Sequence, residues 1–421
     1  MVKLLIIADD LTGTLDTGIQ FSERGIATKV QIGAEYTNNQ EECQVLVIDS
    51  ETRHLDASEA YKIVNKIATQ AIKAGVPYIF KKTDSALRGN IGAELEALYQ
   101  AGKETLAFIP AFPKMNRATQ NGIHLIDGLP VSQSVFGIDP FDPVTKDSVK
   151  EIINQQSKLK VKEVFNLSGY KVKENQQILS FDATTQEDII AIASKLQAEN
   201  QLKLMAGCAG FASILPDLLG LDGGSNKDYK KTDGLLVVCG SVNPITKSQL
   251  DYASEQGFTR IRLTHEQKLN KAYWYSEEGE KTICELYEQI KNLPNVIIDT
   301  NDIEGLLKTM DYAKETYGMS LDEARVFISE NLGYVLRRLV EMGLNHSLMV
   351  TGGDTLLGFV EEMNVTQLDM ICEIESGTVL SEFEYAGKTF NLLSKSGGFG
   401  EVELLLNLEN KLRGDLVYAN E

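Results

Sequence analysis

The sequence predicts an α/β protein that consists of two α/β domains with mainly parallel sheets. Short apolar runs alternate along the chain with stretches in which apolar residues recur every three to four positions. This alternation is typical of strands that are followed by helices. A glycine-rich polar segment interrupts the pattern near the middle of the chain, and the length of 421 residues agrees with two or three domains.

The predicted strands are short apolar runs bounded by polar residues or glycine. They cover residues 3–8, 29–31, 45–49, 78–81, 105–109, 235–239, 260–263, 295–299 and 347–351. Helices are predicted between most of them, with the clearest patterns over 57–74 and 93–101. Because residues 220–231 are rich in glycine and polar side chains, we place a linker at 221–234 between domains of residues 1–220 and 235–421.

The charge of the chain limits its partners. With 41 Lys and Arg against 60 Asp and Glu, the net charge is −19, which argues against binding to nucleic acid or to an anionic membrane. Residues 231–421 contribute −14 of this charge, whereas residues 81–117, with 6 basic and 4 acidic side chains, are locally at +2. A small anion can therefore be bound there.

The cysteines and the N-terminus indicate the compartment. The five cysteines are dispersed and include no CxxC pair, a pattern that favours reduced thiols. The first apolar run is too short for a signal peptide, and no run is long enough to span a membrane. The sequence therefore predicts a cytoplasmic protein.

Two adjacent carboxylates, Asp9 and Asp10, follow the first predicted strand and precede Thr12-Gly13. The carboxyl ends of parallel strands are where open α/β sheets bind ligands. A carboxylate pair at this position can accept hydrogen bonds from a polyol, hold Mg²⁺ or act as a general base. The alternative is that one aspartate only caps the next helix.

A second polar cluster follows the strand at 78–81 and consists of Lys81, Lys82, Thr83, Asp84, Ser85 and Arg88. Its cations suit a carboxylate or a phosphate, and Gly89 and Gly92 leave backbone amides at the next helix start as a predicted anion site. The alternative is a solvated charged loop. Arg53 follows another strand and can join this cluster, as can the loop at 110–122. A lone histidine, His124, is more often structural than catalytic.

The C-terminal half contains three glycine-rich segments near strand ends. They are Gly240-Ser241, Gly352-Gly353-Asp354-Thr355 and a predicted loop at residues 393–400. None matches the Walker pattern or a GxGxxG sequence. Glycines at such turns let the backbone approach phosphate oxygens, so three of them in one α/β domain predict a nucleotide-phosphate site.

Together these motifs resemble the four-carbon acid sugar kinase family. They comprise residues 7–13 with 15–18, 81–85 with 87–92, 110–113, 240–241, 352–355 and 395–400, and they follow the family's order over nearly the whole chain. The resemblance implies a kinase that uses ATP and Mg²⁺ to phosphorylate the terminal hydroxyl of D-threonate, D-erythronate or 3-oxo-tetronate. It places the sugar acid in the N-terminal domain and the nucleotide in the C-terminal domain, and it allows a homodimer.

The resemblance assigns residues 9, 53 and 82–85 to the sugar acid and residues 241, 352–355 and 398 to ATP, and the motifs themselves supply the other candidates. The sugar-acid ligands are expected to be Asp9, Arg53, Lys81, Lys82, Thr83, Asp84, Ser85 and Arg88. The nucleotide ligands are expected to be Ser241, Gly352, Gly353, Asp354, Thr355, Lys395, Gly397 and Gly398, with Asp354 also as a Mg²⁺ ligand. One departure is Ala86, where many relatives carry Thr or Ser. The Asp16-Thr17-Gly18 variant is closer to the threonate and erythronate branch.

Phosphoryl transfer needs mainly positioning and neutralisation of charge. We expect Arg53 and Lys82 to hold the substrate carboxylate, and the two domains to close over both substrates. The catalytic carboxylate that accepts the hydroxyl proton is expected among Asp9, Asp10 and Asp84. The alternatives are a kinase for another small hydroxy acid, a regulator that binds a nucleotide or a sugar acid without turnover, and an interaction scaffold.

Overall fold

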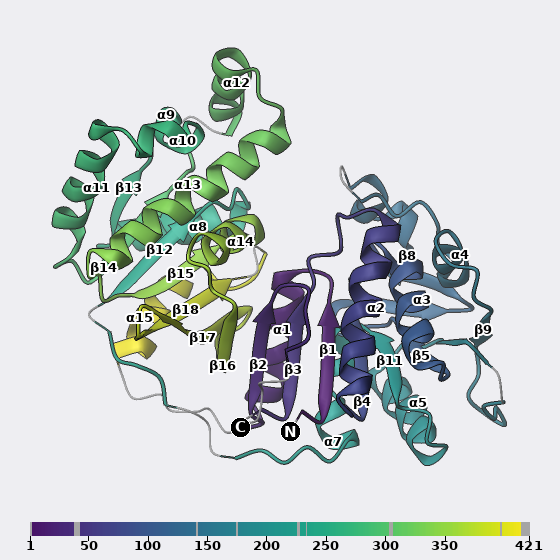
Figure 1. Ribbon diagram of the computed structural model, residues 1–421. Helices are drawn as coiled ribbons and strands as arrows, with labels where there is room; N and C mark the ends of the chain where they lie inside the picture. The colour runs from purple at the N-terminus through teal and green to yellow at the C-terminus, as the bar shows by residue number, and fades with distance from the viewer. Residues whose placement is uncertain are drawn as a thin grey trace. The chain divides into compact units, whose positions relative to one another are not determined.

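The computed structural model describes residues 2–37, 43–139, 142–173, 176–224, 228–232, 234–302, 306–395 and 398–413. The chain forms two compact units, unit 1 (Met1–Asn226) and unit 2 (Lys227–Glu421) (Figure 1). Both units contain a sheet that is parallel over most of its strands, so the predicted α/β class is confirmed. The predicted linker at 221–234 lies partly outside the described residues.

The main sheet of unit 1 has the order β2-β3-β1-β4-β11-β5-β10-β9, and every pairing in it is parallel. Its strands are β1 (Leu4–Ala8), β2 (Thr28–Ile32), β3 (Val45–Asp49), β4 (Tyr78–Lys82), β5 (Leu106–Ile109), β9 (Val161–Val164), β10 (Ile178–Phe181) and β11 (Leu204–Gly207). The side chains of β1, β3, β5, β10 and β11 are buried throughout, as expected for a parallel sheet covered on both faces.

Helices and a small antiparallel sheet complete unit 1. The helices are α1 (Leu11–Ser22), α2 (Ala57–Lys73), α3 (Ile91–Gly102), α4 (Val149–Asn154), α5 (Gln186–Ala198), α6 (Ala209–Ala212) and α7 (Leu215–Leu218). The small sheet consists of β6 (Arg117–Gln120), β7 (Ile123–Ile126) and β8 (Leu129–Pro130). The apolar face predicted over 57–74 is the buried face of α2.

Unit 2 begins with the same strand pattern and ends with an antiparallel meander. Its sheet has the order β13-β14-β12-β15-β18-β17-β16, in which the last two pairings are antiparallel. The strands are β12 (Leu235–Cys239), β13 (Thr259–Arg262), β14 (Asn295–Asp299), β15 (Ser347–Thr351), β16 (Gln367–Glu375), β17 (Thr378–Tyr385) and β18 (Lys388–Lys395). The prediction of a loop at 393–400 is wrong in part, because residues 393–395 form the end of β18 and pair with β15 and β17.

The helices of unit 2 are α8 (Pro244–Glu255), α9 (His265–Leu269), α10 (Lys271–Trp274), α11 (Glu277–Ile290), α12 (Leu306–Tyr317), α13 (Leu321–Glu341), α14 (Gly353–Glu362) and α15 (Leu404–Arg413). In the part of the chain that the structure describes, no helix is both long and apolar enough to cross a bilayer.

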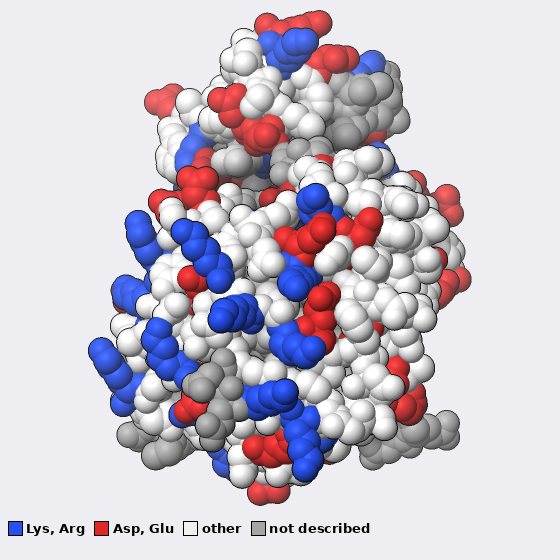
Figure 2. All heavy atoms as spheres, turned by 90° about the vertical axis from the view of Figure 1, so that its right-hand side faces the viewer, with Lys and Arg blue, Asp and Glu red and all other residues white. Residues whose placement is uncertain are grey.

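Lysine side chains cluster near the edge strand β9. Residues 146–173 contain seven lysines and three acidic residues, and Lys160 and Lys162 are exposed. Figure 2 faces this side of unit 1 and shows that Lys and Arg gather on part of it. Lysines on an edge strand discourage the addition of a further strand, which accounts for this charge within an acidic chain.

Candidate functional site

The ends of β1 and β4 form the topological switch point of unit 1. From β1 the chain runs to β2 and returns through β3 on one side, whereas β4 lies on the other side. In the parallel register Ala8 pairs with both Asp49 and Lys82, so Asp9, the next residue, lies beside the end of β4. Open α/β sheets bind ligands at such points, and the two predicted clusters meet here.

Arg53 joins three of the predicted carboxylates. Its Nε donates to Asp9 Oδ2 at 2.7 Å, and its Nη1 donates to Asp10 Oδ2 at 2.7 Å. Its Nη2 lies 3.8 Å from Asp84 Oδ1. Arg88 binds the same Asp84 through Nε at 3.1 Å and Nη2 at 2.9 Å. The structure therefore unites five predicted residues in one ion-pair network.

The network keeps the carboxylates of Asp9 and Asp84 ionised. Burial raises the pKa of the Asp9 carboxyl, but Arg53 and the neighbouring lysines outweigh burial, and the pKa is lowered. The pKa of Asp84 is lowered in the same way, with burial opposed by Arg53 and Arg88. Asp84 also accepts the backbone amides of Ala86 and Arg88, so both of its oxygens are used. Through these hydrogen bonds Asp84 holds its own loop in place.

Three polar atoms in this region remain available to a ligand. Asp9 Oδ1 and Thr83 Oγ1 are buried and have no hydrogen-bond partner in the described structure. The ammonium of Lys82 lies over the first turn of α1, where a Cβ at Gly13 would be 2.8 Å from Lys82 Nζ. No salt bridge within the described residues engages this ammonium, although Lys82 is largely buried. An anionic group and two hydroxyls would satisfy all three atoms.

Lys81 does not share this role, although it is adjacent in sequence. Successive strand residues point to opposite faces, and Lys81 Nζ lies 3.0 Å from Glu94 Oε2 on α3. It also donates to the carbonyl of Lys82 at 2.8 Å. Both Lys81 and Glu94 are buried, and burial raises the pKa of the Glu94 carboxyl despite this pairing. Lys81 therefore anchors α3 to the sheet.

The predicted anion site at the start of α3 is corrected by the structure. The side chain of Gln156 accepts from the amide of Gly92 at 3.0 Å and approaches that of Ala93 at 3.5 Å. A Cβ at Gly92 would overlap the carbonyl of Ile153. The glycine is thus needed for close packing against the C-terminal end of α4, and the amide of Gly92 is already used.

His124 contacts the Asp84–Arg88 loop from the interior of unit 1. Its ring is fully buried, with Nε2 at 2.8 Å from the carbonyl of Ser85 and Nδ1 at 3.3 Å from Thr119 Oγ1. Burial lowers the pKa of the imidazole to about 4, so the ring is neutral at pH 7. His124 therefore has the structural position that the sequence favoured.

This burial predicts a pH dependence of stability. In an unfolded chain the pKa of His124 returns to about 6.5, so the unfolded state binds the proton more tightly. The contribution of the neutral ring is complete above pH 6.5 and is lost as the pH falls towards 4, by about 3 kcal/mol. Urea unfolding should show a smaller loss between pH 7 and 4 in His124→Gln than in the wild type. Equal losses would contradict this assignment.

Unit 2 repeats the switch point between β12 and β15. Cys239 at the end of β12 pairs with Thr351, so the turns Gly240-Ser241 and Gly352-Gly353 lie side by side. Gly352 has a φ of +109°, which favours glycine. Gly240 is needed for another reason, because a Cβ there would overlap Thr355 Oγ1 on α14.

Gly240→Ala is expected to lower the free energy of unfolding by about 1–3 kcal/mol, because the methyl group forces β12 and α14 apart. Thermal unfolding measures this change. Gly398→Ala is the control, since the nearest atom to a Cβ there is 4.0 Å away. Adding Thr355→Ala should restore part of the lost stability, and a Gly240→Ala variant as stable as the wild type would contradict the packing argument.

The start of α14 offers backbone amides to an anion. Gly352 provides no side-chain cap, in contrast to Asn243, which caps α8 by accepting from the amide of Ile245 at 2.9 Å. Uncapped amides and the helix dipole favour negative charge at this point. Asp354 lies in the first turn, is exposed, and forms an ion pair of 2.6 Å with Arg325.

Two of the remaining predicted residues of unit 2, Lys395 and Gly398, lie at the same sheet edge. Lys395 pairs with Thr351 in the register of β18 and donates to Thr246 Oγ1 on α8 at 3.2 Å. Burial lowers the pKa of its ammonium to about 8. Gly398 follows near the side chain of Asn243, and Gly397 lies outside the described residues.

Sequence reasoning missed Asn301, which supports the Gly240-Ser241 turn. Its amide nitrogen donates to the carbonyl of Ser241 at 3.0 Å and to Asp299 Oδ1 at 2.8 Å. Asp299 is held in turn by Arg260 at 2.6 Å. The sequence contained a clue, because Asn301 lies two residues after the predicted strand 295–299, which is next to β12.

Two family matches cover most of the chain. Residues 4–215 match the sugar-binding N-terminal domain, and residues 236–405 match the nucleotide-binding C-terminal domain. The D-threonate kinase of Salmonella typhimurium is 29% identical over 95% of this chain and 96% of its own length. The D-erythronate kinase of Heliobacterium modesticaldum is 26% identical over 89% of this chain and 88% of its own length. The 3-oxo-tetronate kinase of Pseudomonas fluorescens is 26% identical, with 97% and 96% covered.

Solved structures share the fold. A protein of Salmonella typhimurium LT2 superposes with a TM-score of 0.81 at 20% identity, over 97% of this chain and 99% of that chain. A Haemophilus influenzae protein gives a TM-score of 0.76 at 20% identity, over 97% and 100%. With both domain matches in this order and kinases of the three four-carbon acids among its relatives, the chain belongs to the four-carbon acid sugar kinase family.

Proposed function

We propose that the protein transfers the terminal phosphoryl group of ATP to the terminal hydroxyl of a four-carbon sugar acid of the D-threonate, D-erythronate or 3-oxo-tetronate type. The domain of residues 1 to about 220, in unit 1, binds the acid, and the domain from about residue 235, in unit 2, binds the nucleotide. One observation carries the proposal: at the switch point of unit 1, Asp9 Oδ1 and Thr83 Oγ1 are buried without hydrogen-bond partners, and no salt bridge of the described residues engages the largely buried Lys82.

Lys82 is the cation best placed for the carboxylate of the acid. Arg53 already binds three carboxylates, and Arg88 is engaged by Asp84 and by Asp139 at 3.1 Å. We therefore assign both arginines to positioning, in place of direct binding by Arg53. Thr83 Oγ1 and the half-buried Ser85 offer hydrogen bonds to the hydroxyls of the chain.

Asp9 is the carboxylate best placed to orient the attacking hydroxyl and to take its proton. Asp10 uses Oδ1 to accept the amide of Gly13 at 3.0 Å and Oδ2 to bind Arg53, and both oxygens of Asp84 are used. Asp9 alone of these three has a buried oxygen without a partner. Because the transition state of phosphoryl transfer is loose, an ionised acceptor with a lowered pKa suffices.

The uncapped start of α14 and the Gly240-Ser241 turn are proposed to bind the phosphates, with Lys395 supplying positive charge. Within the described residues, no group of three or more His, Cys, Asp or Glu side chains could hold a metal by itself. Mg²⁺ takes few protein ligands when it is bound with a nucleotide, so one exposed carboxylate, Asp354, fits it. There the ion would neutralise phosphate charge.

The proposal is tested by measuring ADP release with Mg-ATP against a panel of tetronates, with pentonates and a three-carbon hydroxy acid as comparisons. We expect turnover with at least one four-carbon acid and the highest kcat/KM within that class. A higher kcat/KM for a three- or five-carbon acid would establish the alternative of a kinase for another hydroxy acid. Binding of nucleotide without turnover of any acid would favour a regulator.

A further inference from the structure

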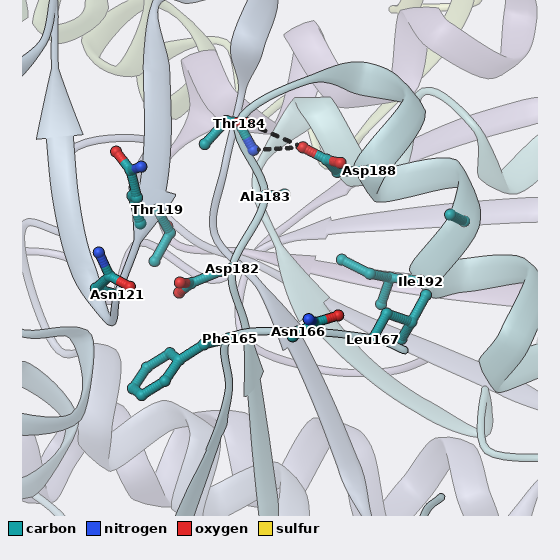
Figure 3. Close-up of a pocket in the computed structure, with 12 residues that line it drawn as sticks. Thr119, Asn121, Phe165, Asn166, Leu167, Asp182, Ala183, Thr184, Asp188 and Ile192 are labelled. Carbon is teal, nitrogen blue, oxygen red and sulfur yellow. Dashed lines mark hydrogen bonds between the residues drawn. The ribbon is translucent and has the colours of Figure 1, made fainter. Parts of the chain in front are cut away.

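A cavity of about 390 Å³ lies at the carboxyl ends of β9 and β10 in unit 1 (Figure 3). The turn after β6, the segment after β9 and the start of α5 form its walls. Asp182 follows β10 directly, and Figure 3 shows its carboxylate between Asn121 and Phe165. A volume of this size is within the range of small-molecule sites.

The cavity differs from the candidate catalytic site in place and in charge. β10 is three strands away from β4 in the sheet, which corresponds to about 14 Å. The lining includes the carboxylates of Asp182 and Asp188 and no lysine, arginine or histidine. An anionic sugar acid or a nucleotide therefore meets only negative charge there.

The polar side of the cavity has one carboxylate with remaining acceptor capacity. Asp182 Oδ1 accepts the amide of Gly122 at 3.1 Å, which fixes the carboxylate against the β6–β7 turn. An ionised carboxylate has about four acceptor positions, so the amides of the β6–β7 turn leave part of this capacity open. Asp188 differs, because its Oδ2 already accepts from Thr184 and Thr185 in the capping box of α5.

Apolar side chains also line the cavity, both beside Asp182 and on the far side. Phe165 is 54% exposed, although it is a large aromatic residue. Leu167, Ala191 and Ile192 also line the cavity. A ligand that fits must combine an apolar or aromatic body with a positively charged hydrogen-bond donor, because such a donor is attracted by both carboxylates.

We propose that this cavity is a second ligand site, which binds a small organic amine through an ion pair with Asp182 and packing on Phe165. The site does not depend on the proposed kinase reaction, since neither residue belongs to the catalytic cluster.

Three probes with the same ring test the proposal: benzylamine, benzyl alcohol and benzoate, each titrated by ligand-detected NMR. We expect benzylamine to bind best and benzoate to bind worst. Asp182→Asn keeps an acceptor for Gly122 and should weaken benzylamine about tenfold while leaving benzyl alcohol little changed. Asp222→Asn, an exposed aspartate of the same unit, is the control. Phe165→Ala should weaken all three probes.

The NMR signals of the four histidine side chains show where the probe binds. Thr119 lines the cavity and contacts His124 at 3.3 Å, whereas His54, His265 and His346 do not line it. Benzylamine should shift the imidazole ¹⁵N signals of His124 and leave the other three in place, and D-threonate should not displace it. Benzoate binding as tightly as benzylamine, an unchanged affinity in Asp182→Asn, or displacement by D-threonate would overturn the proposal.

Discussion

Asp9→Asn is expected to lower kcat by about 10²–10⁴, the usual contribution of a positioned acid or base. Asparagine keeps the shape of the side chain and one acceptor oxygen, but it cannot take the proton of the attacking hydroxyl. Arg53 retains Asp10 and Asp84, so its guanidinium stays paired and the fold should persist. Steady-state kinetics measure kcat and KM, and thermal unfolding verifies the fold.

Asp10→Asn is the matched control, because it changes the neighbouring carboxylate in the same way. Both oxygens of Asp10 serve the structure, one at the start of α1 and one on Arg53. We therefore expect a loss of stability with a much smaller loss of kcat. If Asp10→Asn lowered kcat more than Asp9→Asn in equally folded variants, the catalytic carboxylate would be Asp10.

The position of the site could be predicted because strand ends carry its residues. A parallel sheet brings the carboxyl ends of adjacent strands together, so Asp9 and Lys82, 73 positions apart in the sequence, had to lie at one edge once both strands were recognised. The same reasoning placed Gly240 beside Gly352. In these cases the chemistry follows directly from strand order.

The partners of each side chain could not be predicted, because they depend on segments distant in sequence. Nothing near Gly92 indicates that Gln156 takes its amide, 64 positions later. Arg53 appeared to be a free cation, yet three carboxylates from two other segments neutralise it. The strands β6 to β11 and β16 to β18 were not predicted either, although β17 alternates apolar and polar residues in part.

Lys82→Met is expected to raise the KM for the sugar acid about 10- to 100-fold, which corresponds to the 1.5–3 kcal/mol typical of a hydrogen bond to a charged group. Methionine fills the space of the lysine stem over Gly13 without its charge. The KM for ATP should change little, since Lys82 belongs to unit 1. A preserved KM for the acid would remove Lys82 from the carboxylate site.

Lys81→Met makes the same substitution one residue earlier, and we expect it to act on stability instead. It leaves the buried Glu94 without its partner at 3.0 Å, which costs about 3–5 kcal/mol for a buried ion pair. Burial already raises the pKa of Glu94, so its carboxyl can take up a proton once Lys81 is absent. The loss of stability should then lie near the lower end of this range. The double variant Lys81→Met/Glu94→Gln should regain stability, since no buried charge then remains. The two adjacent lysines on opposite faces of β4 would thus have separate roles, one in substrate binding and one in anchoring α3. The KM for the acid measures the first role, and urea unfolding measures the second.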